Sequence, residues 1–182
     1  MTRHRGSDRI AMSRAICSVL VMIGVAGCAA PGPDDRGLEL SLGEVEIPAG
    51  SAHRVFQGGR PVGGAGVLAP YCELEIQTVS QQPQHVAPVR ARVTRVSQRL
   101  LKDPTTRIPA LLAGIDCSEP LFRETTWWLT ADGPSPVLWL RCLAPYFYCR
   151  IGDPLTAEQI QAVVGPTISI DYVAAAHPVV PR

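Results

Sequence analysis

Apolar and polar residues alternate along several short segments of this chain. Leu38, Leu40 and Leu42 alternate with polar residues, and the pattern continues to Ile47. A period of two places one row of apolar side chains against a core and is typical of a half-buried β-strand. Residues 38–47 are therefore predicted to form a strand.

A second alternating segment covers residues 72–79. Leu74 and Ile76 are predicted to point inward, and Glu73 and Glu75 outward. Two carboxylates on one face of a strand have the chemistry for acid–base catalysis. The simpler interpretation, a strand face in contact with water, is preferred because nothing in the sequence requires either carboxylate to be buried.

Residues 89–101 have both strand and helix periodicity. Their β-branched content and the preceding Pro88 favour a strand with a bulge near Arg95. The segment carries a basic stripe, which comprises Arg90, Arg92, Arg95, Arg99 and Lys102. The stripe is expected to face water, with contact to anionic lipid or glycan as the alternative.

The last third of the chain adds a hairpin, a helix and a final strand. Residues 122–130 and 136–142 are predicted to pair, and residues 167–171 to form the last strand. Residues 153–165 are predicted to be a helix, with Thr156 as its N-cap and Gln159 three residues later. The expected fold class is α+β but mainly β: a small antiparallel sheet or partly open barrel with one C-terminal helix, closed by disulfides. Residues 38–173 would form this single domain, followed by a tail over 174–182.

The charge of the chain gives no reason to expect nucleic-acid binding. The chain has 17 basic and 16 acidic residues. Four arginines and one aspartate precede residue 15, which leaves 13 basic and 15 acidic residues and a net charge of −2. A nucleic-acid-binding domain needs a basic surface to neutralise phosphates.

The N-terminus has the three parts of a secretory signal peptide. Residues 1–14 are polar and basic, and residues 15–26 are apolar, too few for the ~20 residues of a membrane-spanning helix. The following VAGC, residues 25–28, resembles the lipobox of bacterial lipoproteins.

The lipobox resemblance implies where the protein is located. It implies cleavage of the signal peptide 1–27 by signal peptidase II and a lipid-modified Cys28 at the new N-terminus. Residues 28–37 would then form a flexible tether. Ala29 after the cysteine implies, by the sorting rule of the family, the periplasmic side of the outer membrane. Two acyl chains anchor a protein stably, so the membrane is an expected partner.

Export changes what the remaining cysteines are expected to do. Cys72, Cys117, Cys142 and Cys149 would occupy an oxidising compartment, in which an even number indicates disulfides. The strand-like and loop-like surroundings favour Cys72–Cys142 with Cys117–Cys149. The alternative pairs Cys142 with Cys149 and Cys72 with Cys117. The sequence contains no C-x-x-C, and no metal or cofactor is expected.

Few other residues suggest chemistry. The glycine-rich segment 57–66 lacks the Gly-Lys-Ser/Thr of a phosphate-binding loop and is expected to be a hairpin or irregular loop. His53 is the one histidine with a suggestive position, beside this loop. Trp127 and Trp128 are adjacent, so in a strand they face opposite sides, one of them in the core. The candidate surface for a ligand or partner comprises Trp127, Trp128, His53 and Arg92.

Two functions are compatible with these patterns. The segments IPAGSAHRVFQGGRPVGG and PYCELEI are similar to uncharacterised lipoproteins of proteobacteria, a resemblance that implies no activity. The first hypothesis is a non-enzymatic lipoprotein that binds or scaffolds an envelope protein or peptidoglycan. The second is an enzyme acting on cell-wall glycan, or its regulator, that uses Glu73, Glu75 or His53. The second requires these groups to meet in one pocket beside an exposed tryptophan.

Overall fold

Antiparallel strands dominate the computed structural model, which describes residues 37–110, 119–148 and 150–172. The strands are β1 (Leu38–Leu42), β2 (Val45–Ile47), β3 (His53–Gln57), β4 (Arg60–Val62), β5 (Tyr71–Ile76), β6 (Gln84–Val86), β7 (Val89–Asp103), β8 (Ile108–Pro109), β9 (Leu121–Ala131), β10 (Val137–Tyr146) and β11 (Ile168–Tyr172). Helix α2 (Ala157–Val164) and the 3-10 turn η1 (Gly165–Thr167) precede the last strand.

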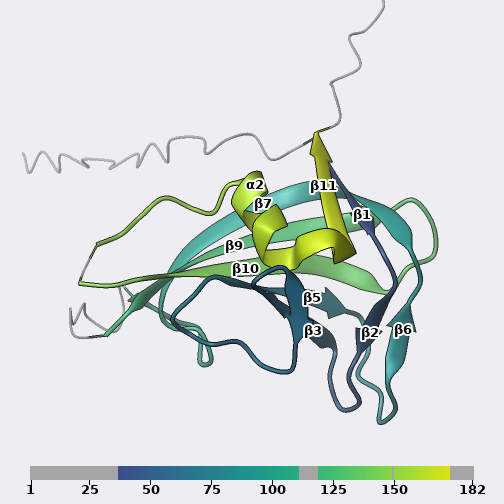
Figure 1. The fold of residues 1–182 in the computed structure, drawn as a ribbon, viewed down its shortest axis with the longest axis horizontal. Coiled ribbons are helices and arrows are strands. Elements are labelled where there is room, and N and C mark those ends of the chain that lie inside the picture. Colours follow the sequence, from purple (N-terminus) through teal and green to yellow (C-terminus); the bar gives the residue numbers. More distant parts are fainter. Residues whose placement is uncertain (1–36, 111–118, 149, 173–182) are drawn as a thin grey trace, which may run out of the picture. The chain divides into compact units, whose positions relative to one another are not determined.

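Nine of these strands form one curled sheet (Figure 1). Its order is β11-β1-β7-β9-β10-β5-β3-β4, with β8 paired to β7. Helix α2 contacts β11 near one edge and β3 and β4 at the other, so it packs across the open side of this half-barrel. The predicted fold class, mainly β with a partly open barrel and a C-terminal helix, is confirmed.

The interior of the half-barrel is apolar, as the alternation predicted. Phe56, Leu74, Trp127 and Leu140 point inward from neighbouring strands and are at most 1% exposed. Ile160 of α2 packs in the same cluster. Because α2 supplies apolar side chains to the interior, it covers the side of the core that a further strand would cover in a closed barrel.

The predicted strand over residues 38–47 is two strands in different sheets. β1 pairs with β7 and β11, whereas β2 pairs with β6 in a separate two-stranded sheet. Between them, the amide of Gly43 donates to the carbonyl of Thr167 at 2.8 Å. The chain therefore leaves the large sheet at Gly43, although its apolar residues stay buried on both sides of the break.

The predicted bulge in the long strand β7 is confirmed. The register with β9 shifts between Val93 and Arg95, so Thr94 is the extra residue. The shift keeps Arg92 and Arg95 on the same side of the sheet, opposite Thr130 and Trp128. By the same alternation Arg90 and Arg99 lie on this side too, whereas Lys102, next to Leu101, points to the other side. The face of the four arginines points away from α2, and we call it the outer face.

The charges of the basic stripe are paired with neighbouring side chains. Arg90 lies 3.8 Å from Glu39, Arg92 3.1 Å from Asp132, Arg99 3.7 Å from Glu124 and Lys102 3.5 Å from Glu119. The guanidinium of Arg95 lies 4.0 Å from the centre of the Trp128 ring. Four of the five positive charges thus lie near a carboxylate, which weakens the attraction of the stripe for an anionic surface.

Helix α2 has the predicted N-cap, Thr156, and ends at Gly165, but residues 153–155 of the predicted range precede it. Thr156 accepts from the amide of Gln159, and the Gln159 side chain accepts from the amide of Thr156, which completes a capping box. Gly165 ends the helix with φ 66° and packs against the backbone of Gly59. The Gly59 amide also donates to Val163 at 3.0 Å, which joins the β3–β4 hairpin to the helix.

A disulfide joins β5 to β10. Cys72 and Cys142 lie directly opposite each other in the two strands and form the bond, buried in the core. The preferred pairing of these two cysteines is confirmed, and the alternative, Cys142 with Cys149, is wrong. Cys28, Cys117 and Cys149 lie outside the described residues, as do the residues up to 36 that are predicted to form the signal peptide and most of the tether.

Candidate functional site

The outer face carries charged side chains next to the disulfide. Because side chains alternate along a strand, Glu73 and Arg141 point away from the core, each next to a disulfide cysteine. They lie directly opposite each other in β5 and β10. Glu124, on the neighbouring strand β9, faces the same side and lies opposite Leu143, two residues after Arg141.

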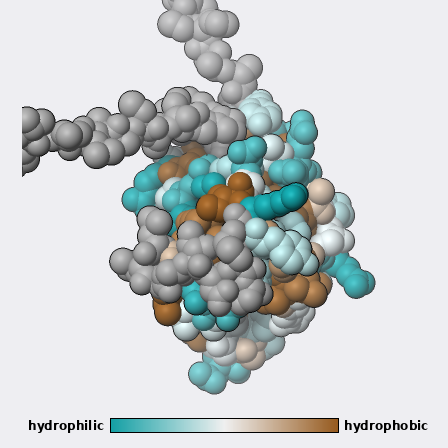
Figure 2. All heavy atoms as spheres, turned by 90° about the vertical axis from the view of Figure 1, so that its left-hand side faces the viewer, coloured by the Kyte–Doolittle hydropathy of each residue, from teal (hydrophilic) through white to brown (hydrophobic). Residues whose placement is uncertain are grey.

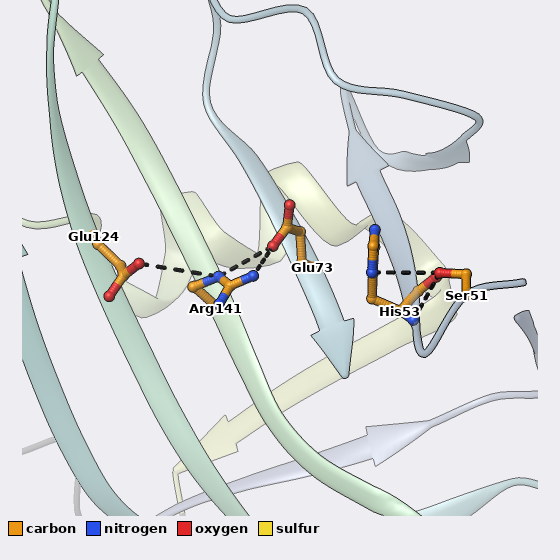
Figure 3. A network of polar contacts seen from close by, with 5 residues as sticks. All are labelled: Ser51, His53, Glu73, Glu124 and Arg141. Atoms are coloured by element: carbon orange, nitrogen blue, oxygen red, sulfur yellow. Dashed lines mark hydrogen bonds and ion pairs between the residues drawn. The ribbon is translucent and has the colours of Figure 1, made fainter. Parts of the chain in front are cut away.

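Arg141 lies between two carboxylates (Figure 3). Its Nε donates to Glu73 Oε2 at 3.0 Å, and its Nη2 donates to the same oxygen. Its Nε also lies 4.0 Å from Glu124 Oε2. The side chains of Arg141, Glu73 and Glu124 are 8%, 17% and 4% exposed. The expectation that Glu73 lies on a solvated face is wrong, because Arg141 holds it in a largely buried ion pair.

A polar cavity of about 310 Å³ opens beside this ion pair. It is lined by His53, Tyr71, Glu73, Glu75, Pro104, Thr105, Arg107 and Arg141. We call it the outer pocket. The sheet supplies one wall and the turn between β7 and β8 supplies the other, so a ligand in it would touch residues far apart in the sequence.

The turn that forms the second wall is held by Asp103. Its carboxylate accepts from the Thr106 hydroxyl at 2.7 Å and from the Thr105 amide at 2.8 Å. These hydrogen bonds, the Thr106 one foremost, lower the pKa of Asp103. The backbone of Arg107 adopts φ 56°, which ends the turn and leads into β8. The turn thus presents Thr105 and Arg107 to the pocket.

His53 stands at the exposed edge of the outer pocket. Its Nδ1 lies 3.3 Å from the Ser51 hydroxyl (Figure 3). This contact is no nucleophile–base pair, because the same hydroxyl donates to the His53 carbonyl and accepts from the His53 amide, both at 3.0 Å. Such local bonds are typical of a serine that shapes the backbone of a turn. Ser51 therefore orients His53 and is not positioned as a nucleophile.

Two indoles extend the pocket along the sheet. Reading across β7, β9, β10, β5 and β3, the register aligns five side chains of the outer face: Arg95, Trp128, Trp139, Glu75 and His53. The rings of Trp128 and Trp139 meet edge to face, with centres 4.9 Å apart. We call this set the tryptophan row. Trp139 is the neighbour of Glu75, which lines the pocket.

The structure brings together only part of the candidate surface. His53 lines the pocket with Glu73 and Glu75, and Trp128 lies further along the same face. Trp127 is 1% exposed and belongs to the core, because it points opposite to Trp128. Arg92 is paired with Asp132 and does not line the pocket.

Sequence reasoning missed five of the eight residues that line the pocket, among them Arg141, Tyr71 and Arg107. Arg141 interrupts an apolar strand, VLWLRC, and a lone charge in such a run indicates a buried ion pair. Tyr71 is 6% exposed and resembles any other core aromatic in the sequence. Nothing in the sequence near Arg107 indicates that its turn folds over the sheet.

A second cavity, of about 620 Å³, is also lined by residues of this turn. It is more apolar, with Val67, Ile108 and Phe122 in its lining. Figure 2 shows one end of the molecule, where the visible apolar residues form separate patches among polar ones. This cavity shares Pro104 and Thr105 with the outer pocket but contains none of its carboxylates.

Burial gives Tyr71 an unusual titration. Loss of hydration, reinforced by the nearby Glu73 carboxylate, raises the pKa of Tyr71 to about 12. Unfolding returns this pKa to about 10. The Tyr71 contribution to stability is thus complete below pH 10 and is lost as the pH rises toward 12, at about 1.4 kcal/mol per pH unit.

We therefore expect Tyr71→Phe to flatten the fall in stability between pH 10 and 12. Denaturant unfolding of both proteins at a series of pH values measures this slope. Tyr172→Phe, at a tyrosine that is 68% exposed, is the matched control and should keep the wild-type slope. An equally steep fall in Tyr71→Phe would contradict the burial argument.

Comparisons with known proteins give no relative from which a function of the site could be inferred. No family model, curated protein or solved structure matches the chain. Within the described ranges, no helix is both long and apolar enough to cross a membrane. In the same part of the chain, no group of three or more His, Cys, Asp or Glu residues is arranged to hold a metal ion.

Proposed function

We propose that this chain is an envelope lipoprotein, anchored through a lipid on Cys28 to the periplasmic side of the outer membrane, whose β domain binds another envelope component without catalysis. The lipobox-like VAGC supports the anchor. The observation that carries the export is the Cys72–Cys142 bond, because disulfides persist in oxidising compartments and are rare in the cytosol. The outer pocket supports a binding role.

Cys28→Ser is expected to abolish incorporation of radiolabelled palmitate and to leave the unprocessed precursor. The physical reason is that the cysteine thiol is the only group at this site that can form the lipid thioether. The experiment is labelling in a Gram-negative host, followed by electrophoresis. Cys17→Ser changes the other cysteine of the leader and should be labelled and processed normally. Normal labelling of Cys28→Ser would overturn the anchor.

The binding role is tested by crosslinking in intact cells. A photo-crosslinking residue at position 107, on the rim of the outer pocket, should capture a discrete envelope component. The same residue at position 158, an exposed site on α2, is the control. Recovery of the same bulk lipid and wall material from both positions would count against a specific binding role.

A second candidate, an enzyme acting on cell-wall glycan or its regulator, is favoured by one observation. His53, Glu73 and Glu75 line a single cavity, with Trp139 beside Glu75. A carboxylate and an imidazole in one cavity are suited to proton transfer. However, Glu73 is engaged by Arg141, which leaves Glu75 and His53 for such a role.

The two candidates differ in whether glycan is cleaved. Purified protein would be incubated with isolated peptidoglycan, and both sedimentation with the wall and release of reducing ends would be measured. Binding without release supports the proposed function. Release of reducing ends by the wild type, but not by Glu75→Gln, would reject the proposed binding function and support the enzyme.

A further inference from the structure

The outer pocket presents hydrogen-bond donors and acceptors to the same small space. Arg141 donates through Nε and Nη2 to Glu73, and its Nη1 makes no hydrogen bond to any described residue. Arg107 and Thr105 add donors from the turn, and Glu75 adds an acceptor with no ion-pair partner in the described part of the chain. A ligand here must satisfy donors and acceptors that lie side by side.

The charges of the pocket select against ions of either sign. Two guanidinium groups, of Arg107 and Arg141, face two carboxylates, of Glu73 and Glu75. An anionic ligand attracted by the arginines is repelled by the carboxylates. A protonated amine attracted by the carboxylates is repelled by the arginines. Hydroxyl groups avoid this conflict, because each one both donates and accepts. The pocket thus fits an uncharged ligand with several hydroxyls.

Size and the adjoining indole narrow the ligand further. A volume of about 310 Å³ lies at the small end of ligand pockets, which range from about 300 to 1,000 Å³. Trp139 follows Glu75 in the tryptophan row, so a ligand longer than the pocket would extend over an indole. Aromatic rings supply large apolar contact area for such a ligand.

We infer that the outer pocket binds one pyranose unit of a saccharide, with Glu75 and Arg107 bonding its hydroxyls and Trp139 contacting the next unit. This inference names the ligand of the binding function proposed above, and so rests on it. Glu75 is placed by its register between His53 and Trp139. Arg107 faces it from the turn.

Calorimetric titration of the purified protein tests the inference with defined probes. N-acetylglucosamine and its β-1,4-linked trimer serve as saccharides, and glycine serves as a zwitterion. The monomer should bind in the millimolar range, as is usual for so small a ligand. The trimer should bind at least about tenfold more tightly, because it adds contact with an aromatic ring.

Variants assign the binding to the pocket. Glu75→Gln should weaken binding by about tenfold or more, since a hydrogen bond to a charged acceptor is among the strongest kinds. Glu46→Gln removes an exposed carboxylate of β2 and should bind like the wild type. His53→Gln, at an exposed position, should fold normally and weaken binding less. Circular dichroism checks that each variant is folded.

The remaining outcomes overturn the inference. Absence of saccharide binding, equal affinity of Glu75→Gln and Glu46→Gln, or binding of glycine in place of the sugars would each reject a pyranose site. Lipid labelling at Cys28 is measured separately. Sugar binding by a protein whose Cys28 carries no lipid would reject the anchor and keep the pocket.

Discussion

Arg141→Leu is expected to lower the free energy of unfolding by about 3–5 kcal/mol, the usual cost of leaving a buried charge without its partner. The Arg141 side chain is 8% exposed, and it is the cation that faces both Glu73 and Glu124. Glu124 retains only the looser contact with Arg99, at 3.7 Å. Leucine would leave two carboxylates largely removed from water, with too little positive charge beside them. Equilibrium unfolding in urea measures the loss.

Arg92→Leu is the matched control for this substitution. Arg92 also forms an ion pair, 3.1 Å from Asp132, but the two side chains are 65% and 42% exposed. Exposed pairs contribute about 0–1 kcal/mol, so this variant should remain near wild-type stability. Adding Glu73→Gln and Glu124→Gln to Arg141→Leu should recover part of the loss by removing the unpaired charges. Equal stability of Arg92→Leu and Arg141→Leu would refute the buried network.

Removal of the Cys72–Cys142 disulfide should have a similarly large effect. Replacing both cysteines by alanine is expected to cost about 4 kcal/mol, because the bond closes a loop with a sequence separation of 70 residues and restricts the unfolded chain. The two buried sulfur atoms are lost as well. Guanidinium unfolding of the variant and the wild type gives the difference.

A reductant provides an independent check on the disulfide. The comparison is made in a chain carrying Cys117→Ala and Cys149→Ala, so that of the four domain cysteines only Cys72 and Cys142 remain. Reductant should then lower its stability toward that of the doubly substituted protein. An unfolding midpoint that is the same with and without reductant would show that the bond contributes nothing.

Local patterns were sufficient to predict the longer strands and the helix, but not the short strands β3, β6 and β8. The capping box at Thr156 depends on two residues that are three positions apart. The inward orientation of Leu74 follows from the alternation of apolar and polar residues next to it. The break at Gly43 was not predictable in this way. It depends on a hydrogen bond to Thr167, which is distant in the sequence and reaches Gly43 only in the folded chain.

The outer pocket depends on strand pairing, which local patterns do not specify. Glu73 and Arg141 are 68 residues apart, and alternation shows only that Glu73 points opposite to Leu74. The preferred Cys72–Cys142 pairing would have specified the register between the two strands. In an antiparallel pair each step forward on one strand is a step back on the other, so Cys72 opposite Cys142 implies Glu73 opposite Arg141. The turn that brings Arg107 over the sheet has no such signal.

The position of the disulfide also limits how far this chain can be stretched. A protein tethered at one end and bound to a partner at the other experiences pulling forces along its backbone. The covalent bond between Cys72 and Cys142 withholds 70 residues from extension, or about 240 Å of extended chain. The pulled segments are those outside this loop, among them β3 with His53. The rest of the outer pocket, on β5, β10 and the turn between β7 and β8, lies within the loop or at its ends. All of the outer pocket except His53 is therefore built on the part of the molecule that tension cannot draw out.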